Sequence, residues 1–129
     1  MKPQNAACPC GSGAAYAACC GPCHGGVAAP DAERLMRSRY SAYVLGLEDY
    51  LFATWHPDTR PPTLDLNAPP RARWLGLEVK RHAVQDADRA TVEFIARYKL
   101  NGRACRLHET SRFVRHQGRW FYVDGDVGQ

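Results

Sequence analysis

The sequence of 129 residues contains no uninterrupted apolar run of about 18 residues, so we expect no transmembrane helix. The residues before Cys8, MKPQNAA, also lack the apolar core of a secretory signal peptide. We therefore expect a cytoplasmic protein. In that reducing compartment, clustered cysteines bind metals more often than they form disulfides.

The sequence also lacks a strong charge bias. Residues 1–30 contain one lysine and no acidic residue, and residues 31–129 carry sixteen basic and thirteen acidic residues, or +3. This near balance argues against dedicated nucleic-acid binding. A phosphate-binding glycine loop, a nucleophile elbow and a dinucleotide fingerprint are absent as well, so no motif identifies an enzyme class.

Cysteine, by contrast, is concentrated near the beginning of the sequence. Four of the six cysteines lie in the segment CPCGSGAAYAACC, as Cys8, Cys10, Cys19 and Cys20. Tyr16 is the only large apolar residue of this segment, so the segment cannot bury enough surface to fold alone. Two pairs of thiols around a glycine-containing turn are typical of a tetrahedral Zn²⁺ site. We expect these four thiolates to bind one structural zinc, with no position left open for a substrate.

The residues between the two pairs fit a metal-binding turn. Gly11 and Gly13 allow positive φ angles, and the N–H groups of residues 11–13 could donate to thiolate sulfurs. Residues 14–18 favour a helical turn that would present the second pair. Gly21-Pro22 is expected to turn the chain away, so residues 21–30 are predicted to be a linker.

Three alternatives to this ligand set stay open. Disulfides could join one pair of cysteines to the other. Cys23 or His24 could replace Cys20 as a ligand. The adjacent thiols of Cys19 and Cys20 could instead carry redox chemistry.

The rest of the sequence predicts helices followed by an antiparallel sheet. Asp31 is the expected N-cap of a first helix that ends near Gly46, and a second helix is expected to begin near Glu48. Residues 57–73 are rich in proline and predict a long loop, a candidate rim or lid. Apolar side chains then alternate with polar ones over strands at residues 74–84, 91–100, 105–115 and 119–124. This order predicts an α+β fold with helices on one face of the sheet.

Glu109 is the main candidate for chemistry in this domain. It shares a strand face with Leu107 and Phe113, so its carboxylate stands among apolar neighbours, and Trp55 and Tyr98 are further candidate lining residues of a ligand site. Burial would raise the pKa of an unpaired carboxylate and suit it to acid–base chemistry. A structural glutamate bonded to Arg39 or Tyr40 of the first helix is the simpler interpretation.

Two resemblances sharpen these expectations. CPCGSG followed by CCG resembles the SEC-C motif, the zinc-binding module named for the tail of the SecA preprotein translocase ATPase, and the motif's ligands match Cys8, Cys10, Cys19 and Cys20. Together with PDAERLMRSRYSAYVLG, YLFATWHP, WLGLEV and SRFVRHQGRWFYVDG, it resembles the YchJ-like family of uncharacterised bacterial proteins (UPF0225 type). That resemblance implies an NTF2-like, cone-shaped main domain with a cavity between sheet and helices.

The expected organisation is a SEC-C segment at residues 1–24 and an NTF2-like domain at residues 25–129. The expected function is that of a zinc-binding accessory protein whose knuckle docks a protein partner, by resemblance in translation or export. The alternative is an enzyme or small-molecule binder that uses the cavity, although a binding protein is favoured over an enzyme.

Overall fold

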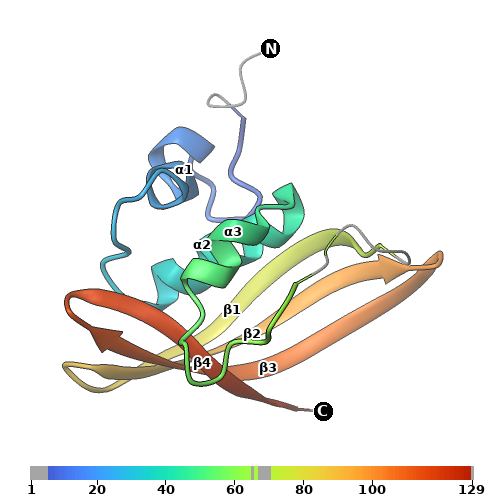
Figure 1. Cartoon of the computed structure of the whole chain (residues 1–129). Coiled ribbons are helices and arrows are strands. Elements are labelled where there is room, and N and C mark those ends of the chain that lie inside the picture. Colours follow the sequence, from blue (N-terminus) through green and yellow to red (C-terminus); the bar gives the residue numbers. More distant parts are fainter. Residues whose placement is uncertain (1–5, 65, 67–70, 129) are drawn as a thin grey trace.

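The computed structural model of the chain describes residues 6–64, 66 and 71–128. Helices α1, α2 and α3 lie on one face of an antiparallel sheet whose strands follow the order β1-β2-β3-β4 (Figure 1). The elements are α1 Cys20–His24, α2 Ala32–Leu45, α3 Glu48–Ala53, β1 Arg73–Asp86, β2 Arg89–Leu100, β3 Arg103–His116 and β4 Arg119–Val127. The α+β class expected from the sequence is confirmed. Within the described residues, every helix is too short or too polar to cross a membrane.

The long helix α2 begins and ends where the sequence predicts. The side chain of Asp31 accepts a hydrogen bond from the backbone N–H of Arg34 at 2.8 Å, which satisfies one of the free donors of the first turn. Gly46 then adopts a left-handed conformation with φ of 75°, which ends the helix. The next helix, α3, begins at Glu48 with two acidic residues in its first turn.

The sheet is a meander joined by tight hairpins. Asn101 and Gly102 both have positive φ, at 54° and 78°, as a two-residue hairpin turn requires. Gln117 and Gly118 repeat this geometry between β3 and β4. The face toward the helices carries Val92 and Phe94 of β2 and Phe113 of β3, all buried. These apolar positions of β2 and β3 form the core together with residues of α2. The alternation expected for β1 is partly wrong, because a register shift between Trp74 and Gly76 leaves Leu75 exposed and packs Trp74 against the core.

The predicted linker at residues 21–30 is partly wrong, because α1 occupies its first residues. Gly21 and Pro22 lie inside this helix instead of turning the chain away. Pro22 is tolerated there because the first-turn N–H groups of a helix need no intrahelical acceptor. The helix packs against α2, above the sheet in Figure 1. The cysteines thus share one core cluster with α2 and the sheet.

After α3 the chain pairs with the last strand. The N–H of Tyr122 donates to the carbonyl of Thr54 at 2.9 Å, and the N–H of His56 donates to the carbonyl of Tyr122 at 2.8 Å. These bonds fix Trp55 beside β4. The predicted loop follows, although residues 65 and 67–70 of it lie outside the described part of the chain.

Candidate metal centre and adjoining cavity

Four cysteine sulfurs gather at one point of the structure. The Sγ atoms of Cys8, Cys10, Cys19 and Cys20 all lie within 4.8 Å of one another, and all four residues are buried. A tetrahedral site with Zn–S bonds of about 2.3 Å has sulfur–sulfur edges of about 3.8 Å. The Sγ atoms of Cys10 and Cys19 are 3.6 Å apart, close to such an edge and far beyond the roughly 2 Å of a disulfide bond. The cluster could hold a metal ion, and its cysteines are free.

The turn between the two pairs is built by local backbone bonds. The N–H of Cys8 donates to the carbonyl of Ala14 at 2.9 Å, which closes the loop that carries the first pair. Gly11 and Gly13 have the expected positive φ, at 78° and 91°. A 3₁₀ turn at Tyr16–Ala18 then leads into Cys19 and α1, so the helical turn expected at residues 14–18 forms slightly later.

Helix α2 supplies hydrogen-bond donors to this cluster. The hydroxyl of Ser41 donates to Cys20 Sγ at 3.3 Å and also lies 3.6 Å from Cys8 Sγ. Arg37 donates to the carbonyl of Cys10 at 3.1 Å, and its guanidinium lies 4.0 Å from Cys10 Sγ. A site of four thiolates with a divalent ion carries a formal charge of about −2, which such donors stabilise. Sequence reasoning missed both residues.

Hydrogen bonding links the protonation of two of the thiols. The bond with Cys20 lowers the pKa of Cys10, and the same bond, together with burial, raises the pKa of Cys20. Without a metal the pair therefore favours one thiolate and one thiol. A bound cation would make all four sulfurs thiolates, so metal binding releases protons.

The alternative ligands Cys23 and His24 lie outside the cluster. Both ring nitrogens of His24 have protein partners: the hydroxyl of Tyr16 lies 2.6 Å from Nδ1, and the carbonyl of Ser38 lies 2.8 Å from Nε2. His24 thus connects the N-terminal segment to α2. Burial raises the pKa of Cys23, which keeps it a neutral packing residue beside the cluster.

A close contact explains the glycine at position 21. A Cβ there would lie 2.9 Å from the carbonyl oxygen of Tyr16 and 3.2 Å from its ring. We expect Gly21→Ala to displace Tyr16 and speed metal extraction by a chelator at least fivefold, because the second pair loses its support. Gly25→Ala is the matched control, since its Cβ would make only ordinary contacts at 3.5 Å and beyond. Equal extraction rates for the two variants would contradict a role for the Gly21–Tyr16 contact in supporting the second cysteine pair.

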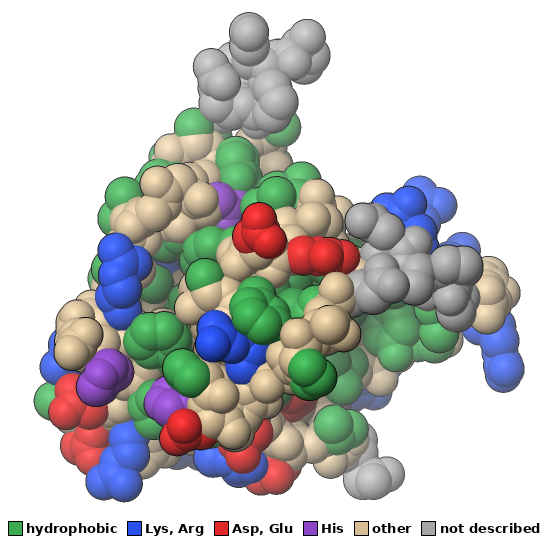
Figure 2. All heavy atoms as spheres, in the orientation of Figure 1, with side chains coloured by type: hydrophobic (Ala, Val, Ile, Leu, Met, Phe, Trp, Pro, Cys, Tyr) green, Lys and Arg blue, Asp and Glu red, His purple; other side chains and the backbone are tan. Residues whose placement is uncertain are grey.

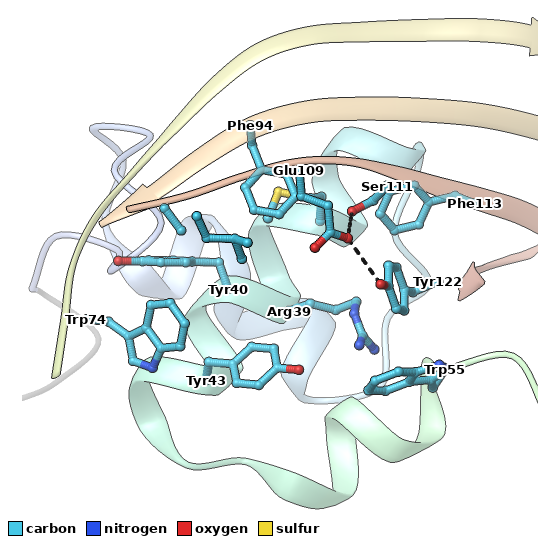
Figure 3. A pocket seen from close by; sticks show the side chains of 13 residues that line it. Arg39, Tyr40, Tyr43, Trp55, Trp74, Phe94, Glu109, Ser111, Phe113 and Tyr122 are labelled. Atoms are coloured by element: carbon cyan, nitrogen blue, oxygen red, sulfur yellow. Dashed lines mark hydrogen bonds between the residues drawn. The ribbon is translucent and has the colours of Figure 1, made fainter. Parts of the chain in front are cut away.

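A cavity of about 230 Å³ lies between the sheet, helix α2 and Trp55, which follows α3 in the chain (Figure 3). Its wall is mostly aromatic and aliphatic, and polar groups reach it from both sides. The lining residues are Met36, Arg39, Tyr40, Tyr43, Trp55, Trp74, Phe94, Ala96, Leu107, Glu109, Ser111, Phe113 and Tyr122. Of the residues predicted to line it, Glu109 and Trp55 do so. Tyr98 is not among them, because its ring packs on Trp74 with centroids 5.1 Å apart.

The partners of Glu109 differ from the structural interpretation made from the sequence. Its Oε2 accepts hydrogen bonds from the hydroxyls of Ser111 at 2.7 Å and Tyr122 at 3.1 Å, and neither Arg39 nor Tyr40 is bonded to it. Gly125 on β4 leaves the room that this carboxylate needs, since a Cβ there would lie 2.7 Å from Glu109 Cδ.

Arg39 is only 5% exposed, and its guanidinium is hydrogen-bonded to groups other than Glu109. Its Nη1 donates to the carbonyl of Leu51 at 2.9 Å and to the hydroxyl of Thr54 at 2.7 Å, at the end of α3. The guanidinium also lies over the rings of Trp55 and Tyr122, at 5.1 and 4.7 Å from their centroids. Burial lowers the pKa of Arg39. The guanidinium thus joins α2 to α3 and β4.

Known protein families match both parts of this chain. Residues 5–22 match the model of the SEC-C motif, and residues 31–125 match that of the YchJ middle NTF2-like domain. The chain belongs to the YchJ-like UPF0225 family. It is 62% identical to a UPF0225 protein of Ralstonia nicotianae, over 95% of this chain and 92% of that one. A UPF0225 protein of Bordetella parapertussis is 59% identical over 98% of both chains.

Two solved structures share the fold. The solution structure of a SEC-C motif containing protein from Rhodopseudomonas palustris has a TM-score of 0.82 at 36% identity, and the match covers 95% of this chain and 98% of that one. The crystal structure of a SEC-C motif containing protein from Psychrobacter arcticus has a TM-score of 0.81 at 31% identity, covering 100% and 86%. The NTF2-like fold and the family predicted from the sequence are confirmed.

Proposed function

We propose that this UPF0225 protein binds one structural Zn²⁺ through Cys8, Cys10, Cys19 and Cys20, and that the surface around the metal docks a protein partner. The observation that carries the metal assignment is the approach of four buried sulfurs to within 4.8 Å of one another. Soft thiolate ligands in a tetrahedral set select zinc over harder cations. We also propose a cytoplasmic location, where reducing conditions keep these cysteines available for a metal.

The chemistry of the knuckle surface supports docking to protein. Residues 6–30, which we call the N-terminal knuckle and its connection, contain no Lys, Arg, Asp or Glu. Figure 2 shows no red or blue side chains over this part of the molecule; they lie below it and farther to the right. Ala17, Pro22 and Val27 are exposed there. Such a surface offers no attraction to phosphate groups and little desolvation penalty to a protein partner.

A charge placed on this surface tests the docking proposal. Ala17→Lys is exposed and is not a ligand, so zinc content and thermal stability should stay unchanged. We expect proteins that cross-link to the wild-type chain in cells of its own organism to be lost with Ala17→Lys. The matched control is Ala104→Lys, which adds the same charge at an exposed position of β3. Equal recovery of every cross-linked protein with both variants would refute docking through the knuckle.

A second candidate function is binding of a small molecule in the cavity. The observation that favours it is a 230 Å³ space that contains a carboxylate, a guanidinium and a tyrosine hydroxyl within an apolar wall. Cavities with this mixture of walls and polar groups are typical of ligand sites. A carboxylate beside tyrosine hydroxyls in an apolar wall would suit either binding alone or acid–base chemistry on a bound molecule.

A further inference from the structure

Polar groups with unused hydrogen-bonding capacity lie on opposite sides of the cavity. On the sheet side, Glu109 Oε2 is bonded to Ser111 and Tyr122, whereas Oε1 has no partner among the described residues. On the helix side, Arg39 Nη1 is bonded to Leu51 and Thr54, and the guanidinium and the Tyr43 hydroxyl beside it both line the cavity, where each can donate to a ligand. Figure 3 shows Arg39 and Tyr43 reaching from α2 while Glu109 extends from β3.

This arrangement defines the hydrogen bonds that a ligand must make. A carboxylate oxygen only accepts, so the ligand must donate to Glu109. A guanidinium only donates, so the ligand must present an acceptor to Arg39 or Tyr43. An anion would meet the Glu109 carboxylate, and a cation would meet the Arg39 guanidinium. In an apolar wall neither charge would be screened by water, which favours a neutral ligand.

The wall and the volume define the ligand's shape. Trp55, Trp74 and Phe94 line the cavity, and flat aromatic side chains favour flat ligands. A cavity of about 150 Å³ is known to hold benzene, so 230 Å³ has room for about nine non-hydrogen atoms. That size corresponds to one ring with a small polar substituent.

We propose that the cavity binds a small, neutral, planar molecule that carries an N–H donor and a carbonyl-type acceptor, such as an aromatic amide or a lactam-containing nitrogen heterocycle. This inference rests on the second candidate function and is independent of docking by the knuckle. The N–H group donates to Glu109 Oε1, the carbonyl accepts from Arg39 or Tyr43, and the ring lies against the aromatic wall.

Four probes of similar size separate this class from its rivals. Benzamide has the proposed donor and acceptor, benzoate is its anionic counterpart, benzamidinium is its cationic counterpart, and toluene has neither group. Binding to the zinc-loaded full chain is followed by NMR through the indole N–H signals of the tryptophans. Trp55 and Trp74 line the cavity, whereas Trp120 lies against a separate pocket near Ala29 and serves as the internal control.

We expect benzamide to shift the Trp55 and Trp74 signals and to leave Trp120 in place, with a Kd of about 1 mM or tighter. The other three probes should bind at least tenfold more weakly. Glu109→Gln should weaken benzamide about tenfold, because the amide NH₂ of glutamine opposes the N–H groups of the ligand. The same variant should strengthen benzoate. Tyr43→Phe should weaken benzamide without that gain.

The control for the carboxylate is Glu93→Gln, since Glu93 lies on the other face of the sheet and pairs with His108 at 2.7 Å. It should leave all four affinities unchanged. Benzoate, benzamidinium or toluene binding as tightly as benzamide would overturn the ligand class while leaving the cavity a binding site. No shift of Trp55 and Trp74 with any probe would overturn the inference and the second candidate function together.

Discussion

A Cys20→Ser variant is expected to lose its zinc and to unfold about 10 °C below the wild type. Cys20 is 1% exposed and lies in the same core cluster as α2, so the sulfurs cannot move into water when the metal leaves. Removing one ligand leaves the buried thiolates without the charge that balances them. A loss of about 3 kcal/mol corresponds to roughly this shift for a domain of this size. Elemental analysis and thermal circular dichroism measure the two effects.

Two cysteine controls sharpen this result. Cys105→Ser changes a half-buried residue of β3 whose thiol is bonded only within its own strand, so zinc content and melting temperature should stay the same. Cys23→Ser changes a buried residue beside the cluster, so it should cost about 1 kcal/mol and keep one zinc per chain. Wild-type protein treated with a chelator should have the same melting temperature as the Cys20→Ser variant. Full zinc content in Cys20→Ser, or its loss in Cys23→Ser, would show that the ligand set is wrong.

The fold was largely predictable because its signals are local. Asp31 and Gly46 mark the ends of α2, period-two alternation marks the strands, and Asn101-Gly102 marks a hairpin. Each signal acts within a few residues of the backbone that it shapes. Helix α1 was missed for the same reason. A Gly-Pro pair normally indicates a turn or loop and not a helix. The close contact of Gly21 with Tyr16, which explains why a glycine fits there, is visible only in the folded structure.

The site was predictable only where residues close in sequence define it. The spacing of the four cysteines predicted the cluster, whereas Ser41 lies 21 residues from Cys20 and reaches it through the packing of two helices. Tyr122 was missed as the partner of Glu109 because a bulge between Arg112 and Phe113 shifts the β3–β4 register. That shift pairs Tyr122 with Phe113, on the face toward the helices. The alternation of apolar and polar residues in the sequence does not reveal this bulge.

The knuckle and the cavity share helix α2, so we expect binding at one of them to affect binding at the other. Arg37 and Ser41 contact the cysteines, while Arg39, Tyr40 and Tyr43, at neighbouring positions, line the cavity. Both rows of side chains belong to one helix, so a shift of α2 at the knuckle would also displace the side chains at the cavity. Zinc should therefore hold the cavity in the form that binds a ligand.

We expect removal of the zinc to weaken benzamide binding at least tenfold, as measured through the Trp55 and Trp74 signals. Linkage requires the reverse effect as well, so saturating benzamide should raise the affinity of the protein for zinc by the same factor. Competition with a chelator measures this affinity. Ser41→Ala keeps all four zinc ligands and removes the hydroxyl that joins α2 to Cys20, so it should weaken benzamide by an intermediate amount. This variant gives the result even if the metal-free chain unfolds.

The matched control is a change that spares α2. Arg112 lies on the other face of the sheet, where it pairs with Asp124 and with Asp126 at 2.7 Å, and all three side chains are exposed. Arg112→Ala should leave benzamide affinity unchanged because exposed ion pairs contribute little. Two results together would mean that α2 transmits nothing between the two sites. Ser41→Ala would bind benzamide as tightly as the wild type, and the metal-free protein would stay folded and bind benzamide equally well. Unequal affinities would make the zinc part of the cavity's function, since the same helix that carries Arg39 and Tyr43 would need the metal to place them.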